Sequence, residues 1–275
     1  MRPSGLPEND NRGCVARYLR HGHRIVPRYK LIIEYDGAAY AGWQRQDNGP
    51  SIQNALEEAA SALDEAPVLV IGAGRTDAGV HATGQVAHLD LGKSIRAEKV
   101  RDAINAHLRP HSIAVLEAFD ASPDFHARFD ATARSYLYRI INRRADLALE
   151  RNRAWRLAAP LDAAIMHEAA QALIGRHDFT TFRDANCQAD TAVKTLREIS
   201  VERHGDEIQV RTTARSFLHR QVRSMVGSLV EVGRGRESAS WIGEILAAAD
   251  RTRCGPVAPA DGLYLTGVSY EPLKA

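Results

Sequence analysis

Residues 195–214 read TLREISVERHGDEIQVRTTA, two β-rich runs on either side of a turn. The turn is formed by His204 and Gly205, because glycine readily adopts the backbone angles that a tight hairpin requires. The sequence therefore predicts an antiparallel hairpin made of strands 195–203 and 207–214.

The segments around this hairpin follow a recognisable order. Before it, the sequence predicts a strand over 135–141 and a helix over 162–173 that ends at Gly175. After it, apolar residues recur at helical spacing from about Ser216 and again from the capping residue Ser238, and residues 262–270 form a closing strand. The order is β-α-β-β-α-β with one added helix.

The first half of the chain repeats this order. Its expected elements are, in turn, strand 29–35, helix 51–64, strands 68–71 and 85–91, helix 95–108 and strand 113–116. Such a β-α-β-β-α-β unit is typical of ferredoxin-like folds, whereas a doubly wound parallel sheet needs strict alternation of strands and helices. We predict an α+β protein with two tandem ferredoxin-like domains, 29–130 and 131–275. Their strands join in one extended, mostly antiparallel sheet with a central basic cleft.

Composition excludes several classes of protein. The 275 residues are 44% hydrophobic and 25% charged, as in ordinary globular proteins rather than disordered or fibrous ones. No apolar run approaches the roughly 20 residues of a membrane span, and the N-terminus has no apolar secretory segment. Cys14, Cys187 and Cys254 lie far apart, which indicates reduced thiols and a cytoplasmic location.

The net charge of +2 hides an uneven distribution. Residues 1–30, 126–156 and 211–236 each carry a net charge of +5, supplied mostly by arginine. Arginine suits bidentate contact with phosphate. This pattern is compatible with basic surfaces that meet a polyanion, and equally with solvated faces whose acidic partners come from elsewhere in the chain.

Residues 71–81, IGAGRTDAGVH, are the densest candidate for chemistry. They do not form a dinucleotide-binding fingerprint, which would need glycine at position 77, and no Gly-Lys-Ser/Thr follows to make a P-loop. What remains is the carboxylate of Asp77 on a glycine-rich loop beside Arg75. The residues alone leave two interpretations open, a catalytic aspartate or an ordinary turn.

Here a family resemblance becomes specific. Residues 74–81 (GRTDAGVH), followed by Gly84-Gln-Val86, resemble the catalytic motif of the tRNA pseudouridine synthase A family. Further segments resemble other motifs of that family, in order: 34–37 (EYDG), 42–46 (GWQRQ), 124–129 (DFHARF), 131–138 (ATARSYLY), 177–182 (HDFTTF) and 217–227 (FLHRQVRSMVG). The resemblance spans about residues 28–270, and the family's two ferredoxin-like halves agree with the order of elements described above.

The resemblance implies an isomerase that converts uridine to pseudouridine at positions 38, 39 and 40 of the tRNA anticodon stem-loop. It implies no cofactor and no metal. In the family, the aspartate of the Arg-Thr-Asp motif is catalytic, and Asp77 matches it. A carboxylate can form a covalent intermediate with an electrophilic carbon. Attack on ribose C1′ and attack on uracil C6 both stay open.

Three residues are candidates for substrate binding, two of them implied by the resemblance. Tyr136 matches the tyrosine that stacks on the uracil, whereas Tyr138 is expected in the core. Arg223 matches the arginine that pairs with the catalytic aspartate, and Arg75 is a candidate phosphate ligand. Each residue also has a plainer interpretation. Tyr136 could be a core aromatic, Arg223 a solvated helical arginine, and Arg75 an arginine that stabilises its loop.

Two histidines and one further arginine are also candidates for binding. His81 and His88 lack a third ligand at metal-like spacing, so loop and strand histidines are expected. The family often has a second histidine where this chain has Arg220 after His219, and Arg220 there is expected to add a phosphate contact.

Other functions remain in view. One is a non-catalytic RNA-binding module, and another is a family member that modifies other tRNA positions. A third is an aspartate-dependent nucleoside hydrolase, for which a second carboxylate near Asp77 is needed and none is evident from the sequence. The resemblance further implies a homodimer and no membrane association.

Residues 1–28 precede the resemblance and show no apolar periodicity. One interpretation is a disordered basic arm that adds RNA affinity through Arg12, Arg17, Arg20 and Arg24. The other is that the natural chain starts near Val26.

Overall fold

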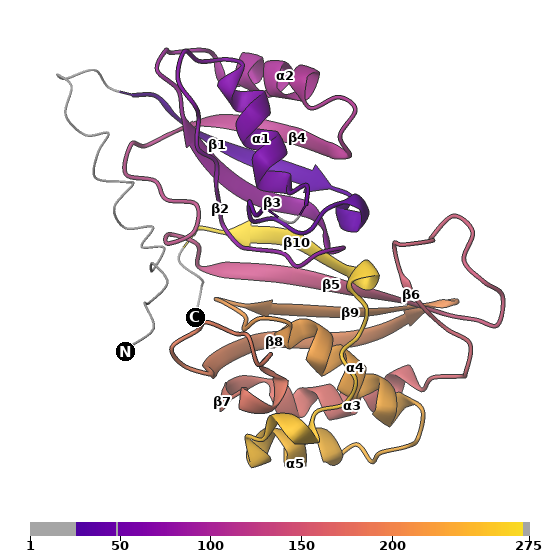
Figure 1. The fold of residues 1–275 in the computed structure, drawn as a ribbon. Coiled ribbons are helices and arrows are strands. Elements are labelled where there is room, and N and C mark those ends of the chain that lie inside the picture. Colours follow the sequence, from indigo (N-terminus) through magenta and orange to yellow (C-terminus); the bar gives the residue numbers. More distant parts are fainter. Residues whose placement is uncertain (1–25, 48, 272–275) are drawn as a thin grey trace, which may run out of the picture.

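The computed structural model describes residues 26–47 and 49–271 (Figure 1). Both interpretations of the N-terminal arm concern residues 1–25, which lie outside this part of the chain. The strands are β1 (Arg28–Tyr35), β2 (Ile71–Gly72), β3 (His81–Asp90), β4 (Ile113–Ala121), β5 (Ala133–Asn142), β6 (Trp155–Leu157), β7 (Gly175–Asp178), β8 (Val193–His204), β9 (Glu207–Ala214) and β10 (Leu263–Ser269). The α-helices are α1 (Ile52–Ser61), α2 (Ala97–His107), α3 (Ala163–Ala170), α4 (Gln221–Gly233) and α5 (Trp241–Ala248). Short 3-10 helices are η2 (Gly37–Ala39), η3 (Gln171–Leu173), η4 (Thr180–Phe182), η5 (Arg251–Arg253) and η6 (Ala260–Gly262).

Within the described residues, all the strands belong to one sheet. Its order is β4-β1-β3-β10-β5-β9-β8-β7, with β2 paired to β3 and β6 paired to β5. Only β10 with β3 and β5 with β6 are parallel pairs there, so the prediction of a large, mostly antiparallel α+β sheet is confirmed. The C-terminal strand β10 lies between β3 and β5, where it joins the two halves of the chain (Figure 1).

Most expected elements are present at close to their expected bounds. The hairpin of β8 and β9 turns at Gly205, which has a φ of +60°, as a tight turn requires. Ser51 caps α1 by accepting a hydrogen bond from the Asn54 backbone N–H at 3.2 Å. The spacing signals were sufficient at these places because hairpins and helix caps depend on neighbouring residues.

The expected strand at 68–71 is mostly wrong, because only Ile71 and Gly72 pair with β3. Side chains of α1 accept the hydrogen bonds from the backbone N–H groups that would otherwise pair in a strand. The N–H groups of Val68 and Val70 donate to Ser61 Oγ at 2.9 Å and Glu57 Oε1 at 3.2 Å. Val68 and Val70 are buried, but against a helix rather than in a ladder.

The helix expected from about Ser216 begins later, at Gln221. Arg220 has a φ of +57°, and this left-handed residue separates the preceding turn from α4. His219 and Arg223 are four residues apart but do not lie on one continuous helical face, because the helix begins between them. The turn nevertheless brings both side chains to the same place, described below.

Two large apolar clusters flank the middle of the sheet. One comprises residues of the first half together with Leu265 of β10, packed with α1 and α2. The other comprises residues of the second half together with Val80, packed with α3, α4 and α5. Tyr136 packs against both clusters, so it lies where the two halves of the molecule meet. None of the helices in the described residues is long and apolar enough to cross a membrane.

Gly227 of α4 provides a test of this packing. A Cβ at this position would overlap the backbone carbonyl of Pro256, which cannot move aside like a flexible side chain. We expect Gly227→Ala to lower the free energy of unfolding by about 1–3 kcal/mol, measured by urea denaturation. The matched control is Gly243→Ala in α5, whose new Cβ would lie 3.7 Å from the Ala172 Cβ, an ordinary contact. This control is expected to be neutral or stabilising, since alanine favours helix; an equal loss in both variants would contradict the packing explanation.

Candidate active site

Asp77 lies on the loop between β2 and β3. Hydrogen bonds within the loop and to β1 hold this loop in place. The Val80 N–H donates to the Asp77 carbonyl oxygen at 3.1 Å, and Gly79 takes a φ of +77° in this turn. Buried Thr76 shares a hydrogen bond of 2.9 Å with the Tyr35 hydroxyl of β1. The backbone that carries Asp77 is thus anchored to the sheet.

The segment of Gly42 and Trp43 packs against the same loop. The Trp43 N–H donates to the Thr76 carbonyl oxygen at 3.0 Å. Gly42 has a φ of +112°, and a Cβ there would lie 2.7 Å from that same oxygen. Only glycine allows the segment to approach so closely, which explains the glycine before Trp43.

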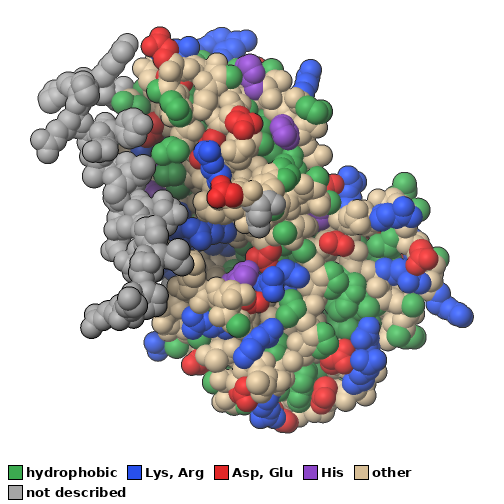
Figure 2. Space-filling view, in the orientation of Figure 1, with side chains coloured by type: hydrophobic (Ala, Val, Ile, Leu, Met, Phe, Trp, Pro, Cys, Tyr) green, Lys and Arg blue, Asp and Glu red, His purple; other side chains and the backbone are tan. Residues whose placement is uncertain are grey.

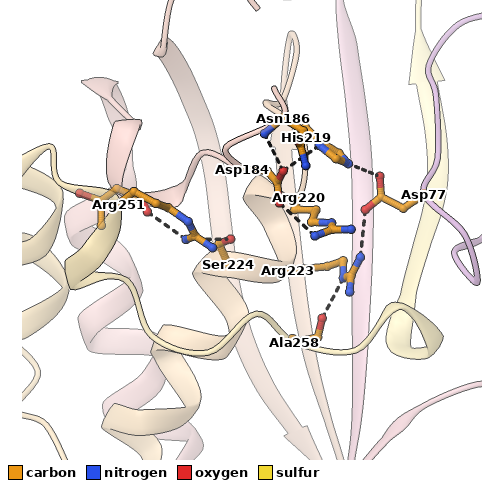
Figure 3. Close-up of polar contacts among 10 residues, drawn as sticks. Asp77, Asp184, Asn186, His219, Arg220, Arg223, Ser224, Arg251 and Ala258 are labelled. Atoms are coloured by element: carbon orange, nitrogen blue, oxygen red, sulfur yellow. Dashed lines mark hydrogen bonds and ion pairs between the residues drawn. The ribbon is translucent and has the colours of Figure 1, made fainter. Parts of the chain in front are cut away.

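Two basic side chains hold the Asp77 carboxylate (Figure 3). Arg223 Nη1 donates to Asp77 Oδ2 at 3.0 Å, and His219 Nε2 lies 3.3 Å from Asp77 Oδ1. Arg223 is itself fixed, because its Nε donates to the Ala258 carbonyl oxygen at 2.8 Å. The structure therefore brings together Asp77 and Arg223, two residues singled out by the sequence, and adds His219.

A second carboxylate lies behind His219 (Figure 3). Asp184 Oδ1 is 3.4 Å from His219 Nδ1, and Asp184 Oδ2 accepts a hydrogen bond from Arg220 Nη1 at 3.0 Å. Burial opposes ionisation of Asp184, but the Asn186 N–H and the positive charge of Arg220 outweigh it and hold the pKa of this carboxyl below its usual range. Arg220 pairs with Asp184 through Nη1 but stays partly exposed, so the phosphate contact expected of it remains a prediction.

Sequence reasoning missed Asp184 altogether. Its position two residues beyond the segment 177–182 was the one available signal. No spacing rule connects it with His219, since the pair is formed by a loop and a turn that only the fold brings together.

Tyr136 lies in the same region, from β5. Its ring meets Phe217 edge-on, with centroids 5.2 Å apart. Burial, and then the negative charge of Asp77, raise the pKa of Tyr136 to about 12, so its hydroxyl stays protonated at neutral pH. Tyr138, two residues along, is fully buried and donates to the Pro259 carbonyl oxygen at 2.8 Å, which confirms its expected place in the core.

Asp77, Tyr136, His219 and Arg223 line one cleft of about 960 Å³. Among the described residues, its lining includes Asp77 and six arginines: Arg75, Arg128, Arg134, Arg215, Arg220 and Arg223. Figure 2 shows basic, acidic and histidine side chains gathered in the middle of this face of the molecule. Arg75, Arg128 and Arg215 form no ion pair with any described residue, so their charges are available to a bound anion.

The arginines of the basic segments lie in two kinds of place. Arg128, Arg134, Arg215, Arg220 and Arg223 bring segments 126–156 and 211–236 to the cleft. Other arginines of segment 126–156 pair with acids, as Arg139 does with Glu207 at 2.9 Å and Arg156 with Asp146 at 3.0 Å. Charge along the sequence did not distinguish the two groups.

The two histidines considered for metal binding have structural contacts. His81 Nδ1 accepts the Gly37 N–H at 3.1 Å, and His88 Nδ1 accepts the Ala127 N–H at 3.1 Å. Burial, followed by the positive charge of Arg28, lowers the pKa of His88 to about 4, so it is neutral at pH 7. Residues 26–47 and 49–271 contain no group of three or more His, Cys, Asp or Glu side chains arranged to hold a metal ion.

The Asp77 carboxylate, held by Arg223 and His219, thus lies with the Tyr136 ring in a cleft lined by arginines. Comparison with known proteins shows the family. A family model described as tRNA pseudouridine synthase matches residues 31–130 and 169–271. The chain belongs to this family, as the resemblance of its motifs predicted.

Several curated relatives are similar over most of their length. The tRNA pseudouridine synthase A of Maricaulis maris is 66% identical over 245 residues, which cover 89% of this chain and 98% of that protein. Proteins of the same name from Afipia carboxidovorans and Xanthobacter autotrophicus are each 63% identical over 245 residues, covering 89% of this chain and all of theirs.

Proposed function

We propose that this protein converts uridine to pseudouridine in tRNA, at positions 38, 39 and 40 of the anticodon stem-loop, with Asp77 as the catalytic carboxylate. The observation that carries the proposal is the contact of Asp77 with Arg223 and His219 inside a cleft lined by arginines. The family membership and the high identity to tRNA pseudouridine synthases A support it.

The reaction is an isomerisation and needs no co-reactant. The bond between N1 and ribose C1′ breaks, the uracil rotates, and a bond forms between C5 and C1′. C5 loses a proton and N1 gains one, so atoms and electrons balance. Asp77 forms a transient covalent bond with either C1′ or C6, as carboxylate nucleophiles do with electrophilic carbons.

Each neighbour then has a role. Arg223 and His219 orient Asp77 through their contacts with its two carboxylate oxygens. Tyr136 stacks on the uracil after the base leaves the helix, which costs a few kcal/mol. Arg75 binds a phosphate next to that nucleotide, since it is exposed, lines the cleft and has no carboxylate partner among the described residues.

The halves of the chain are best interpreted as tandem ferredoxin-like domains, residues 29–130 and 131–275. The strand orders β4-β1-β3-β2 and β10-β5-β9-β8 support this, because both follow the same β-α-β-β-α-β path. The clustering of apolar residues into two cores supports the boundary. We infer that the cleft between them is the RNA-binding surface, and that the protein works in the cytoplasm as a homodimer, as the family resemblance implies.

The hydrolase alternative gains one observation, the second carboxylate Asp184 behind His219. Asp184 is nevertheless poorly suited to act as a general acid, because its pKa is held low and it is paired with Arg220. The anchored Asp77 in turn disfavours a non-catalytic RNA-binding module, which needs no such carboxylate.

The decisive experiment incubates the protein with unmodified tRNA and maps pseudouridine by carbodiimide treatment and reverse transcription. Stops one nucleotide to the 3′ side of positions 38, 39 and 40 are expected. Stops elsewhere would indicate a different set of positions, release of free uracil would favour the hydrolase, and tRNA binding without either product would favour the binding module.

Salt dependence tests the arginine-lined cleft. Each phosphate contact contributes about 0.7–0.9 to the slope of log K against log salt. We expect Arg215→Gln to reduce the slope for tRNA binding by this amount. The matched control is Arg156→Gln, whose guanidinium already pairs with Asp146 and should leave the slope unchanged. Equal slopes for the two variants and the wild type would show that Arg215 does not face RNA.

Asp184→Asn tests the inferred support of His219. We expect kcat to fall about 10-fold and KM for tRNA to change less, because a charged partner of His219 is lost while the RNA surface keeps its arginines. Asp178→Asn is the control, since both aspartates accept the N–H two residues ahead, at 2.9 Å in Asp184 and 2.8 Å in Asp178. A rise in KM at constant kcat would instead assign Asp184 to RNA binding.

A further inference from the structure

Phe129 is an exposed aromatic residue at the edge of the cleft. Its side chain is 70% exposed, although it lines the same cleft as Asp77 and Tyr136. It belongs to the connection between β4 and β5 and has no place in the apolar clusters around the sheet. Exposed aromatic rings in basic clefts are a common means of binding unpaired bases.

The backbone under Phe129 is held in place. His126 Nδ1 accepts the N–H groups of Arg128 at 3.2 Å and Phe129 at 3.3 Å, and Asp130 Oδ2 accepts the His126 N–H at 2.7 Å. Between them, Ala127 is fully buried. The His126 ring also lies against Phe129, with centroids 4.3 Å apart. The ring is therefore presented by an ordered turn, which reduces the entropy lost when a ligand binds.

The turn is also fastened to the rest of the cleft. Arg134 Nη2 donates to the carbonyl oxygens of Arg128 at 2.8 Å and of Ala73 at 2.7 Å. Ala73 belongs to the loop that carries Asp77. Arg134 thus uses its guanidinium to connect the Phe129 turn to the Asp77 loop, so the two have a defined spacing.

One cation lies beside the ring and has no acidic partner among the described residues. The Arg128 guanidinium carbon lies 5.8 Å from the Phe129 ring centroid. Arg75 lines the same cleft as Arg128. Neither forms an ion pair with a described residue, and guanidinium groups without a carboxylate partner suit a phosphate.

We propose that Phe129 and Arg128 form a second nucleotide subsite, where an unpaired base next to the isomerised uridine stacks on Phe129 and its phosphate is bound by Arg128. The proposal rests on the proposed function, because it takes the polyanion in the cleft to be tRNA. It adds a site separate from the Asp77 and Tyr136 contacts with the reacting base. Stacking on a ring tolerates any base, which suits an enzyme that accepts different neighbours around its target.

The test compares Phe129→Leu with Phe129→Trp, and uses Phe119→Leu as the matched control. Phe119 is 44% exposed on β4 and does not line the cleft. Binding of an unmodified anticodon stem-loop RNA is measured by fluorescence anisotropy, together with the single-turnover rate and thermal unfolding. We expect Phe129→Leu to weaken binding about 10-fold, Phe129→Trp to stay within about 2-fold of the wild type, and all variants to unfold alike.

A second measurement identifies the stacked base. Stem-loops with a single abasic nucleotide beside the target should bind the wild type more weakly at one position, and Phe129→Leu should show no further loss there. Normal binding by Phe129→Leu, or equal losses in Phe129→Leu and Phe129→Trp, would overturn the subsite. A wild type that makes no pseudouridine, yet loses RNA affinity with Phe129→Leu, would overturn the proposed function and leave the subsite standing.

Discussion

Asp77→Asn is expected to reduce pseudouridine formation by more than roughly 1000-fold, the scale of effect seen when a nucleophile is removed. An amide is not nucleophilic enough to replace the carboxylate. The substitution preserves the shape of the side chain. In the wild type Arg223 donates to Asp77 Oδ2 at 3.0 Å, and the amide oxygen of asparagine can accept the same hydrogen bond. Fold and tRNA affinity should therefore be retained. Single-turnover assays with excess protein measure the chemical step directly.

Asp120→Asn provides the control for this result. Asp120 is exposed on β4 outside the cleft lining, so its substitution should leave the rate unchanged. Activity of Asp77→Asn within tenfold of the wild type would contradict the assignment of Asp77 as catalyst. A parallel loss of tRNA binding would instead indicate that Asp77 organises the RNA surface.

Tyr136→Phe is expected to have the second largest effect, a loss of about 100-fold in the single-turnover rate with tRNA binding retained. The ring still stacks, but a hydroxyl that donates a hydrogen bond or proton to the reacting base is gone. That hydroxyl has no hydrogen-bond partner among the described residues, and its pKa of about 12 keeps it a donor at neutral pH. Stability should change little, since no internal hydrogen bond is lost.

Tyr138→Phe is the natural comparison, two residues away on β5. Its hydroxyl donates to the Pro259 carbonyl oxygen, so the substitution should cost about 0.5–1.5 kcal/mol of stability and little activity. Opposite patterns in activity and stability would confirm the separate roles of the two tyrosines. Equal rates for both variants would remove the special role of the Tyr136 hydroxyl.

Patterns between neighbouring residues predicted most elements of this fold. The hairpin at Gly205 and the cap at Ser51 were evident because a turn or a helix end is determined by residues within a few positions of one another. Where tertiary contacts compete with such patterns, prediction failed. Val68 and Val70 look like a strand, but the side chains of Ser61 and Glu57 bind their N–H groups instead.

Some residues of the candidate site could also be predicted from the sequence, and others could not. Asp77, Tyr136 and Arg223 could be singled out from long motifs that resemble a known family, and the structure brings them to one cleft. Asp184 could not, because its relation to His219 depends on a loop and a turn that meet only in the folded chain. The exposure of Phe129 could not be predicted either, since an aromatic residue in a sequence can lie in the core or on the surface.

The sequence by itself determined the order of strands and helices, the glycine-rich loop with Asp77 and the family resemblance, because each depends on residues close together in the chain. Only the tertiary structure decided that β10 lies between β3 and β5, which arginines face the cleft and which pair with acids, and that His219 lies between two carboxylates. Some of these outcomes depend on side chains more than a hundred residues apart, as Asp77 and Arg223 are. Their contacts arise from the packing of the whole sheet, and no local pattern encodes them.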